Sequence, residues 1–149
     1  MDKRVIAIAE DIKEMKIRGA AKIGRTVAEA LKLEAESYKG NDPDGFVKDI
    51  KKTARFLIAT RPTAVSLENA LRYVLVELGK GYKNGEDVTS LKKMISKASD
   101  DFCENSNLAL ERIADIGSKR IRDGDVIFTH CNSSMALGII KKAHRDGKK

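Results

Sequence analysis

The sequence predicts a mostly α-helical fold, in which a bundle of five helices is followed by one strand and one helix, a single β-α unit. Three observations lead to this prediction. Apolar residues recur every three or four positions between Val5 and Ile116, the spacing of amphipathic helices. Glycine, proline and aspartate cluster between these stretches, where helices begin and end. A short apolar run, Val126–Phe128, then follows the turn pair Asp123-Gly124 and is typical of a buried strand.

The first two helices are predicted at about residues 3–16 and from Ile23 to about Tyr38, with Arg18-Gly19-Ala20-Ala21 between them. Helical spacing places their core residues on one face each. These residues are Val5, Ile8, Ile12 and Met15 in the first helix, and Ile23, Val27, Leu31 and Ala35 in the second.

The third helix is predicted to begin at Asp42-Pro43, a favourable pair for the N-cap and the first helical position, and to end before Pro62. Gly79 and Gly81 are expected to close the fourth helix. The expected core residues are Phe46, Ile50, Ala54, Leu57 and Ile58 in the third helix, and Leu67, Leu71, Val74 and Leu78 in the fourth.

The fifth helix follows the turn Asn84-Gly85, with Asp87 as its cap and a length of about 30 residues. Cys103, in this helix, is interpreted as a packing residue. The residues expected to face inward are Leu91, Ile95, Ala98, Phe102, Ala109, Ile113 and Ile116. For the last helix, from Met135 onward, the expected face is Met135, Ile139, Lys142 and Ala143, and the candidate N-caps are Asn132, Ser133 and Ser134.

Composition limits the kinds of protein that this chain can be. The length of 149 residues and the 42% apolar content suit a globular protein with a real core. The net charge of +7 permits an anionic ligand, but acidic and basic residues alternate along the helices and the few aromatics do not cluster, so nucleic acid binding is not expected. The two cysteines show no metal-type spacing, and neither a signal peptide nor a membrane span is apparent. A cytoplasmic protein is expected.

The chemistry of the sequence is concentrated around Cys131, which is predicted to lie at the carboxyl end of the strand and just before a helix N-terminus. The partial positive charge of a helix N-terminus favours a thiolate, so Cys131 is a candidate nucleophile or base. A small buried packing residue is the alternative. The neighbouring hydroxyls of Ser133 and Ser134 are suited to a phosphate or a sugar, and we expect them to bind substrate.

Two loops in the bundle have the residues of anion sites. Arg18 and Gly19 stand directly before a helix that starts near Ala20, which combines a cation with free backbone N–H groups. In Thr60-Arg61-Pro62-Thr63 the proline stiffens the loop that contains Arg61. Arginines at helix boundaries also act as ordinary caps or surface ion pairs, which is the alternative for both loops.

A single strand at the end of the chain lacks the parallel neighbours that it needs on its edges. We therefore expect this chain to be the first part of a larger two-domain protein, or a fragment that a second chain completes. On this reading residues 1–122 are the helical domain and residues 123–149 begin the next one.

The stretches Arg18-Gly19-Ala20-Ala21, 60–67 and 124–133, in this order and at this spacing, resemble the family of methylthioribose-1-phosphate isomerase, archaeal ribose-1,5-bisphosphate isomerase and the α, β and δ subunits of translation initiation factor 2B. The archaeal ribose-1,5-bisphosphate isomerases are most similar in the second loop. The resemblance implies that the second domain is Rossmann-like and that a phosphosugar lies in the cleft between the domains. It assigns phosphate and sugar contacts to Arg18, Gly19, Ala20 and Arg61, and an acid/base role to Cys131. The family's second acid/base residue, an aspartate, would lie beyond this chain.

Two functions follow from the resemblance. The first is an aldose–ketose isomerase that converts ribose 1,5-bisphosphate to ribulose 1,5-bisphosphate, is a homo-oligomer and requires no cofactor. The sequence has no dinucleotide or P-loop motif, and His130 and His144 are not spaced to hold zinc with Cys131. The second is a non-catalytic regulatory subunit that binds a protein partner. Cys131 together with Arg18 and Arg61 favours the enzyme, because a regulatory subunit has no need of a thiol at the cleft.

Overall fold

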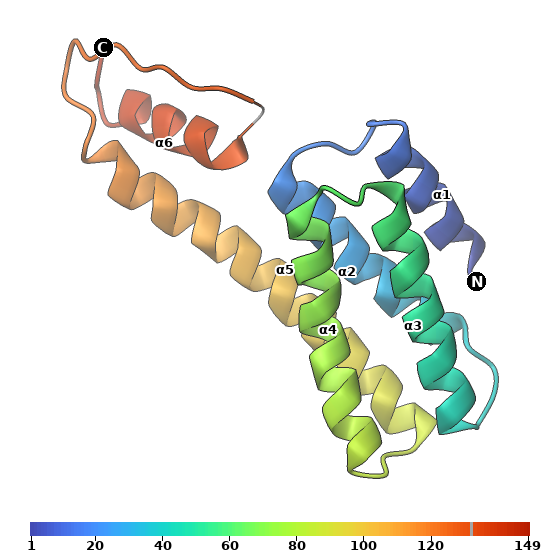
Figure 1. Ribbon diagram of the computed structural model, residues 1–149. Helices are drawn as coiled ribbons and strands as arrows, with labels where there is room; N and C mark the ends of the chain where they lie inside the picture. Colours follow the sequence, from blue (N-terminus) through green and yellow to red (C-terminus); the bar gives the residue numbers. More distant parts are fainter. Residues whose placement is uncertain (132) are drawn as a thin grey trace. The chain divides into compact units, whose positions relative to one another are not determined.

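The computed structural model describes residues 1–131 and 133–149 and is mostly helical, as predicted (Figure 1). Six helices lie in this described part of the chain. They are α1 (Lys3–Lys13), α2 (Ala20–Ser37), α3 (Pro43–Thr60), α4 (Val65–Lys83), α5 (Val88–Ser118) and α6 (Ser134–Arg145). The chain divides into two compact units, Met1–Cys103 and Glu104–Lys149, and α5 contributes to both. The domain boundary expected after residue 122 stays a prediction.

The first unit has a continuous apolar core built from α1 to α4 and the first half of α5. Every core residue predicted for α2 and α4 is buried there, and burial of one leucine or isoleucine side chain stabilises a fold by about 1.5–3 kcal/mol. The largest fully buried side chains of this core are Phe46, Ile12, Leu31, Ile50, Leu57, Leu67, Leu71, Leu78, Leu91 and Ile95. Met15, expected in the core of the first helix, lies outside it because α1 ends at Lys13 and Met15 is exposed.

The glycines near the end of α4 do not end the helix, contrary to the prediction. α4 continues to Lys83, and the chain turns at Asn84-Gly85, where Gly85 has φ 77°. Gly81 is buried, and a Cβ atom at this position would be only 2.9 Å from Cδ2 of Leu91. Gly81 therefore allows α4 and α5 to pack closely, and a pattern of single residues could not separate this role from a helix stop.

The second unit consists of the rest of α5, an extended segment and α6. α6 packs closely on α5, because a Cβ atom on Gly117 would lie 2.6 Å from Cδ1 of Ile139. Ala143 is buried, as its place on the predicted face requires. Ile113 and Ile116, predicted to face inward, are instead exposed.

The predicted strand at residues 126–128 is not formed, and no β-strand lies in residues 1–131 or 133–149. Val126 is 99% exposed and Phe128 is 92% exposed, whereas Ile127 between them is 43% exposed, so two of the three apolar side chains are almost fully uncovered. The physical reason is that a strand needs a neighbour to take up its backbone N–H and C=O groups, and the described chain offers none.

Candidate functional site

The N-terminal ends of α2 and α4 lie against each other in the first unit. Gly24, in the second turn of α2, packs on the second residue of α4: a Cβ atom on Gly24 would be 3.3 Å from the carbonyl oxygen of Ser66. Figure 1 shows both helices beginning at the same end of this unit. The loops that precede them contain Arg18 and Arg61, so the fold brings together the two loops that the sequence indicates as anion sites.

The N-terminal end of α2 lacks the features that usually stabilise a helix start. Gly19 is the N-cap, with φ 89°, a left-handed conformation that favours glycine. Within the described residues no side chain caps this end, and the first turn contains no acidic residue. The first N–H groups of α2 therefore remain available to an anion, next to the exposed side chain of Arg18 and the exposed Ala20.

The N-terminal end of α4 differs from that of α2 in its first turn, which contains the acidic Glu68 and in which the N–H groups of Val65 and Leu67 already donate to the carbonyls of Thr63 (3.2 Å) and Ala64 (2.9 Å). Ala64 is its N-cap, and in the described part of the chain no side chain caps this end either. Arg61 is half-buried; its N–H donates to the carbonyl of Ile58 (3.2 Å), and its own carbonyl accepts the N–H of Ala64 (3.0 Å). The Thr60 hydroxyl donates to the carbonyl of Leu57 (2.6 Å) and so is partly used inside the helix.

The other helices, in contrast, have conventional caps. The carboxylate of Asp2 accepts the N–H of Arg4 (2.8 Å) at α1, that of Asp42 accepts the N–H of Gly45 (2.9 Å) at α3, and that of Asp87 accepts the N–H of Ser90 (2.7 Å) at α5. The two uncapped ends are thus the two that follow the arginine loops. Among the described residues neither Arg18 nor Arg61 forms an ion pair, so both guanidinium groups can bind an anion.

Cys131 lies in the second unit, in an exposed turn before α6. Its φ is 59°, a left-handed conformation that few residues other than glycine adopt. Nδ1 of the neighbouring His130 is 2.8 Å from Sγ of Cys131. Asn132, one of the candidate caps, lies outside the described residues. Cys131 is exposed in this chain, and its roles as an acid/base group or as a buried packing residue both stay predictions.

Ser133 is the N-cap of α6, because its hydroxyl oxygen accepts the N–H of Ala136 (3.2 Å). One of the three candidate caps is therefore confirmed. The hydroxyl proton of Ser133 is still available to a ligand, as is the exposed hydroxyl of Ser134, the first residue of α6.

Cys103 is half-buried, whereas Cys131 is exposed. It packs against the core of the first unit, and its thiol lies 3.7 Å from the carbonyl oxygen of Arg25. Burial raises the pKa of this thiol, with a smaller contribution from Glu29 in the same direction. The interpretation of Cys103 as a packing residue is confirmed.

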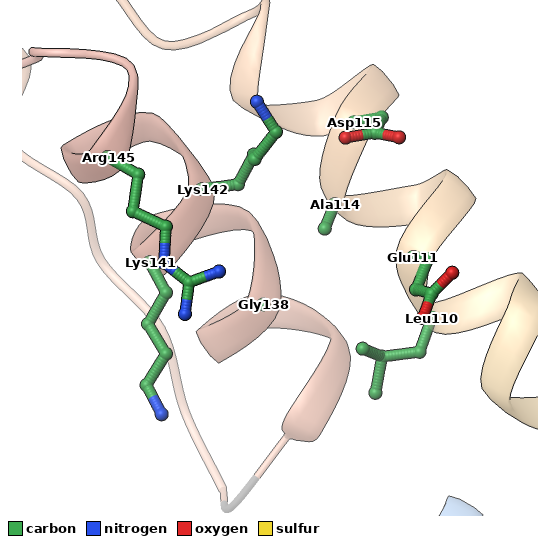
Figure 2. A pocket seen from close by; sticks show the side chains of 8 residues that line it. All are labelled: Leu110, Glu111, Ala114, Asp115, Gly138, Lys141, Lys142 and Arg145. Carbon is green, nitrogen blue, oxygen red and sulfur yellow. The ribbon is translucent and has the colours of Figure 1, made fainter.

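A groove of about 470 Å³ lies between α5 and α6 in the second unit (Figure 2). Acidic side chains come from α5 and basic side chains from α6, as the figure shows for Glu111, Asp115, Lys141 and Arg145. No residue singled out from the sequence as a site residue lines this groove, so it is not the candidate site. Residues 1–131 and 133–149 contain neither a cluster of side chains fit to hold a metal ion nor a helix long and apolar enough to cross a membrane.

Comparison with known proteins identifies the family. A family model described as the initiation factor 2 subunit family matches residues 16–149. The chain belongs to this family. The resemblance seen in the Arg18 loop, the Arg61 loop and the Cys131 turn is thereby confirmed, since all three lie in the matched region.

Relatives of the chain have different names. The ribose 1,5-bisphosphate isomerase of Thermococcus kodakarensis is 51% identical over 98% of this chain and 45% of its own length. The methylthioribose-1-phosphate isomerase of Heliobacterium modesticaldum is 35% identical over 96% of the chain and 43% of its own length. The chain thus spans a little under half the length of these relatives.

Solved structures of the family have the same fold. The translation initiation factor eIF-2B of Pyrococcus horikoshii superposes with a TM-score of 0.81 at 28% identity, covering 100% of this chain and 49% of that one. The 5-methylthioribose 1-phosphate isomerase of the same organism has a TM-score of 0.81 at 31% identity, covering 97% of this chain and 42% of that one. The chain therefore has the fold of a little under half of each of these proteins.

Proposed function

We propose that this chain is part of an isomerase that converts ribose 1,5-bisphosphate to ribulose 1,5-bisphosphate. The observation that carries the proposal is the 51% identity, over 98% of the chain, to a relative named for this substrate. The two adjacent uncapped helix ends, with Arg18 and Arg61 before them, support a substrate that carries phosphate groups.

In the proposed site, Arg18, Gly19, Ala20 and Arg61 contact phosphate and sugar, Ser133 and Ser134 add hydroxyl contacts, and Cys131 exchanges protons with the substrate. The reaction is an internal redistribution of protons and needs no oxidant. C2 and its hydroxyl each lose one proton, the bond from C1 to the ring oxygen breaks, and C1 and the ring oxygen each gain one. A thiol and a carboxylate suffice for these transfers, and the proposal places the carboxylate outside residues 1–149.

The proposal also covers the domain that residues 123–149 begin. In the completed protein, residues 123–149 begin a Rossmann-like domain after a helical domain of residues 1–122, and residues 126–128 form a strand of its sheet. The exposed Val126 and Phe128 support this, because a central strand of such a sheet is buried on both faces. A homo-oligomer in the cytoplasm, with the reduced thiols of Cys103 and Cys131, is part of the same proposal.

A second candidate function is a regulatory subunit of a translation initiation factor, favoured by the similarity to the eIF-2B structure of Pyrococcus horikoshii. The two candidates differ in what the full-length protein does with the sugar. Incubation with ribose 1,5-bisphosphate, followed by ³¹P NMR, should show the signals of ribulose 1,5-bisphosphate. Unchanged substrate at high protein concentration, with binding still detected by calorimetry, would favour the regulatory subunit.

A further inference from the structure

The side chain of His130 contacts the proposed acid/base group. Nδ1 of its imidazole is 2.8 Å from Sγ of Cys131, within hydrogen-bond distance for a sulfur atom. Adjacent residues seldom present their side chains to each other in an extended chain, where successive side chains point to opposite sides. Here the left-handed conformation of Cys131, with φ 59°, accompanies the contact.

Three carboxylates of the second unit have other partners. The carboxylate of Asp123 accepts the N–H of Lys149 (2.7 Å), and that of Asp125 accepts the N–H of Arg122 (2.7 Å). Asp146 pairs with Lys142 at 2.6 Å. In the described part of this unit, the imidazole is the titratable group in contact with the sulfur.

We infer that His130 is a positioning residue for Cys131 and holds the proton of its thiol. The inference deepens the proposed function and rests on it for the role in isomerisation. This role requires the neutral tautomer whose proton lies on Nε2, since Nδ1 then accepts the S–H hydrogen bond. The S–H bond then breaks as the Nδ1–H bond forms, which gives a thiolate and an imidazolium with no change in total charge. The thiolate is the form of Cys131 that removes a proton from carbon.

The contact can be tested on this 149-residue chain without any isomerase assay. Iodoacetamide reacts with thiolates, and mass spectrometry after digestion reports Cys131 and Cys103 separately. The variants are His130→Ala, which removes the imidazole, and His130→Asn, whose amide lies near the place of Nδ1 and forms hydrogen bonds but takes up no proton near neutral pH. The matched control is His144→Asn, because His144 is the second of the two histidines and lies in the last turn of α6.

At pH 7 we expect Cys131 to react about tenfold or more slowly in both His130 variants than in the wild type, and equally fast in all proteins above about pH 9.5, where an exposed thiol is largely ionised. The control should behave as wild type. A wild-type rate in His130→Asn would reduce the role of His130 to a hydrogen bond, and a wild-type rate in both variants would exclude any role. Far-ultraviolet circular dichroism and the slow reaction of Cys103 show that each variant is folded.

The full-length protein separates this inference from the proposed function. If both hold, His130→Asn should lower kcat about 10–100-fold with little change in KM, since the loss concerns proton transfer rather than binding. A pH-dependent effect on alkylation in a protein without isomerase activity would overturn the proposed function and leave the His130–Cys131 pair intact. An active isomerase in which His130→Asn retains the wild-type kcat would overturn the role of the pair in catalysis.

Discussion

The backbone of Gly24 in α2 lies against the carbonyl oxygen of Ser66 in α4, so close that a Cβ atom on Gly24 would be 3.3 Å from that oxygen. The ring of Phe102 is on the same side, at 3.5 Å. This close approach brings the two uncapped helix ends together. The geometry of the proposed phosphate site therefore depends on a residue that touches no ligand.

Replacement of Gly24 by alanine should destabilise the first unit. Alanine is favoured over glycine inside a helix by about 0.5–1 kcal/mol, but here the backbone oxygen of Ser66 has to move, and overpacking costs about 1–3 kcal/mol. Gly79→Ala is the matched control, because nothing lies within 4 Å of a Cβ atom at that position in α4. Urea unfolding should show a lower free energy of unfolding for Gly24→Ala and a higher one for Gly79→Ala. An equal increase in the free energy of unfolding for both variants would mean that the close approach of Gly24 to Ser66 does not constrain α2 and α4.

Replacement of Arg18 or Arg61 by alanine in the full-length protein should weaken binding of ribose 1,5-bisphosphate by about 1.5–3 kcal/mol, the usual strength of a charged hydrogen bond. Calorimetric titration measures this loss directly. Arg55→Ala, at an exposed position of α3, is the control and should bind as the wild type does. Unchanged affinity in both loop variants would make Arg18 and Arg61 ordinary surface residues.

Replacement of Cys131 by serine in the full-length protein should lower turnover by about 10²–10⁴-fold, the typical contribution of general acid/base catalysis, while the substrate still binds. A hydroxyl keeps the shape of the thiol but does not ionise near neutral pH. Cys103→Ala, which alters only a packing thiol, should keep the wild-type turnover per folded molecule. The measurement is the initial rate at saturating substrate. Normal turnover of the serine variant would favour the regulatory subunit over the enzyme.

The acid sensitivity of the fold should depend in part on Asp87. The pKa of its carboxyl is lowered because it accepts hydrogen bonds from the N–H and the hydroxyl of Ser90. A group whose pKa is lower in the folded state contributes stability above its unfolded value, near 3.9 for aspartate, and loses that contribution as the pH falls through the folded value. Asp87→Asn keeps a good N-cap that does not titrate. Urea midpoints measured from pH 6 to pH 2 should therefore fall less steeply in this variant, and identical slopes would mean that Asp87 does not stabilise α5 in this way.

Much of the helical fold could be predicted because local signals and the core agree. Asp42-Pro43 starts α3 with the cap that the residue types indicate, and Ile23, Val27, Leu31 and Ala35 are buried at the expected spacing. The prediction failed where one residue type serves two purposes. Gly81 looks like a helix stop but allows close packing of α4 and α5.

The candidate site was predictable in part for a similar reason. An arginine beside a helix start is visible in the sequence, so Arg18 and Arg61 could be named. The contact between Gly24 and Ser66 could not, because it joins residues 42 positions apart, and no periodicity reports which helix ends meet. The predicted strand failed because Val126–Phe128 has the composition of a strand, while strand formation depends on a neighbouring segment.

The exposed segment Val126–Phe128 also bears on biosynthesis. The first unit has its own core and mostly local helical contacts, so it can fold as soon as it leaves the ribosome. If residues 126–128 form a strand of a later domain, as proposed, this apolar segment stays unpaired until the partners of that strand are synthesised. During that interval it is a template for pairing with the same segment of a neighbouring nascent chain or for capture by a chaperone. Slow translation of the codons just after Phe128 would prolong the exposure of Val126 and Phe128. The yield of the full-length protein should therefore fall more when translation is slowed there than when it is slowed within the helical unit.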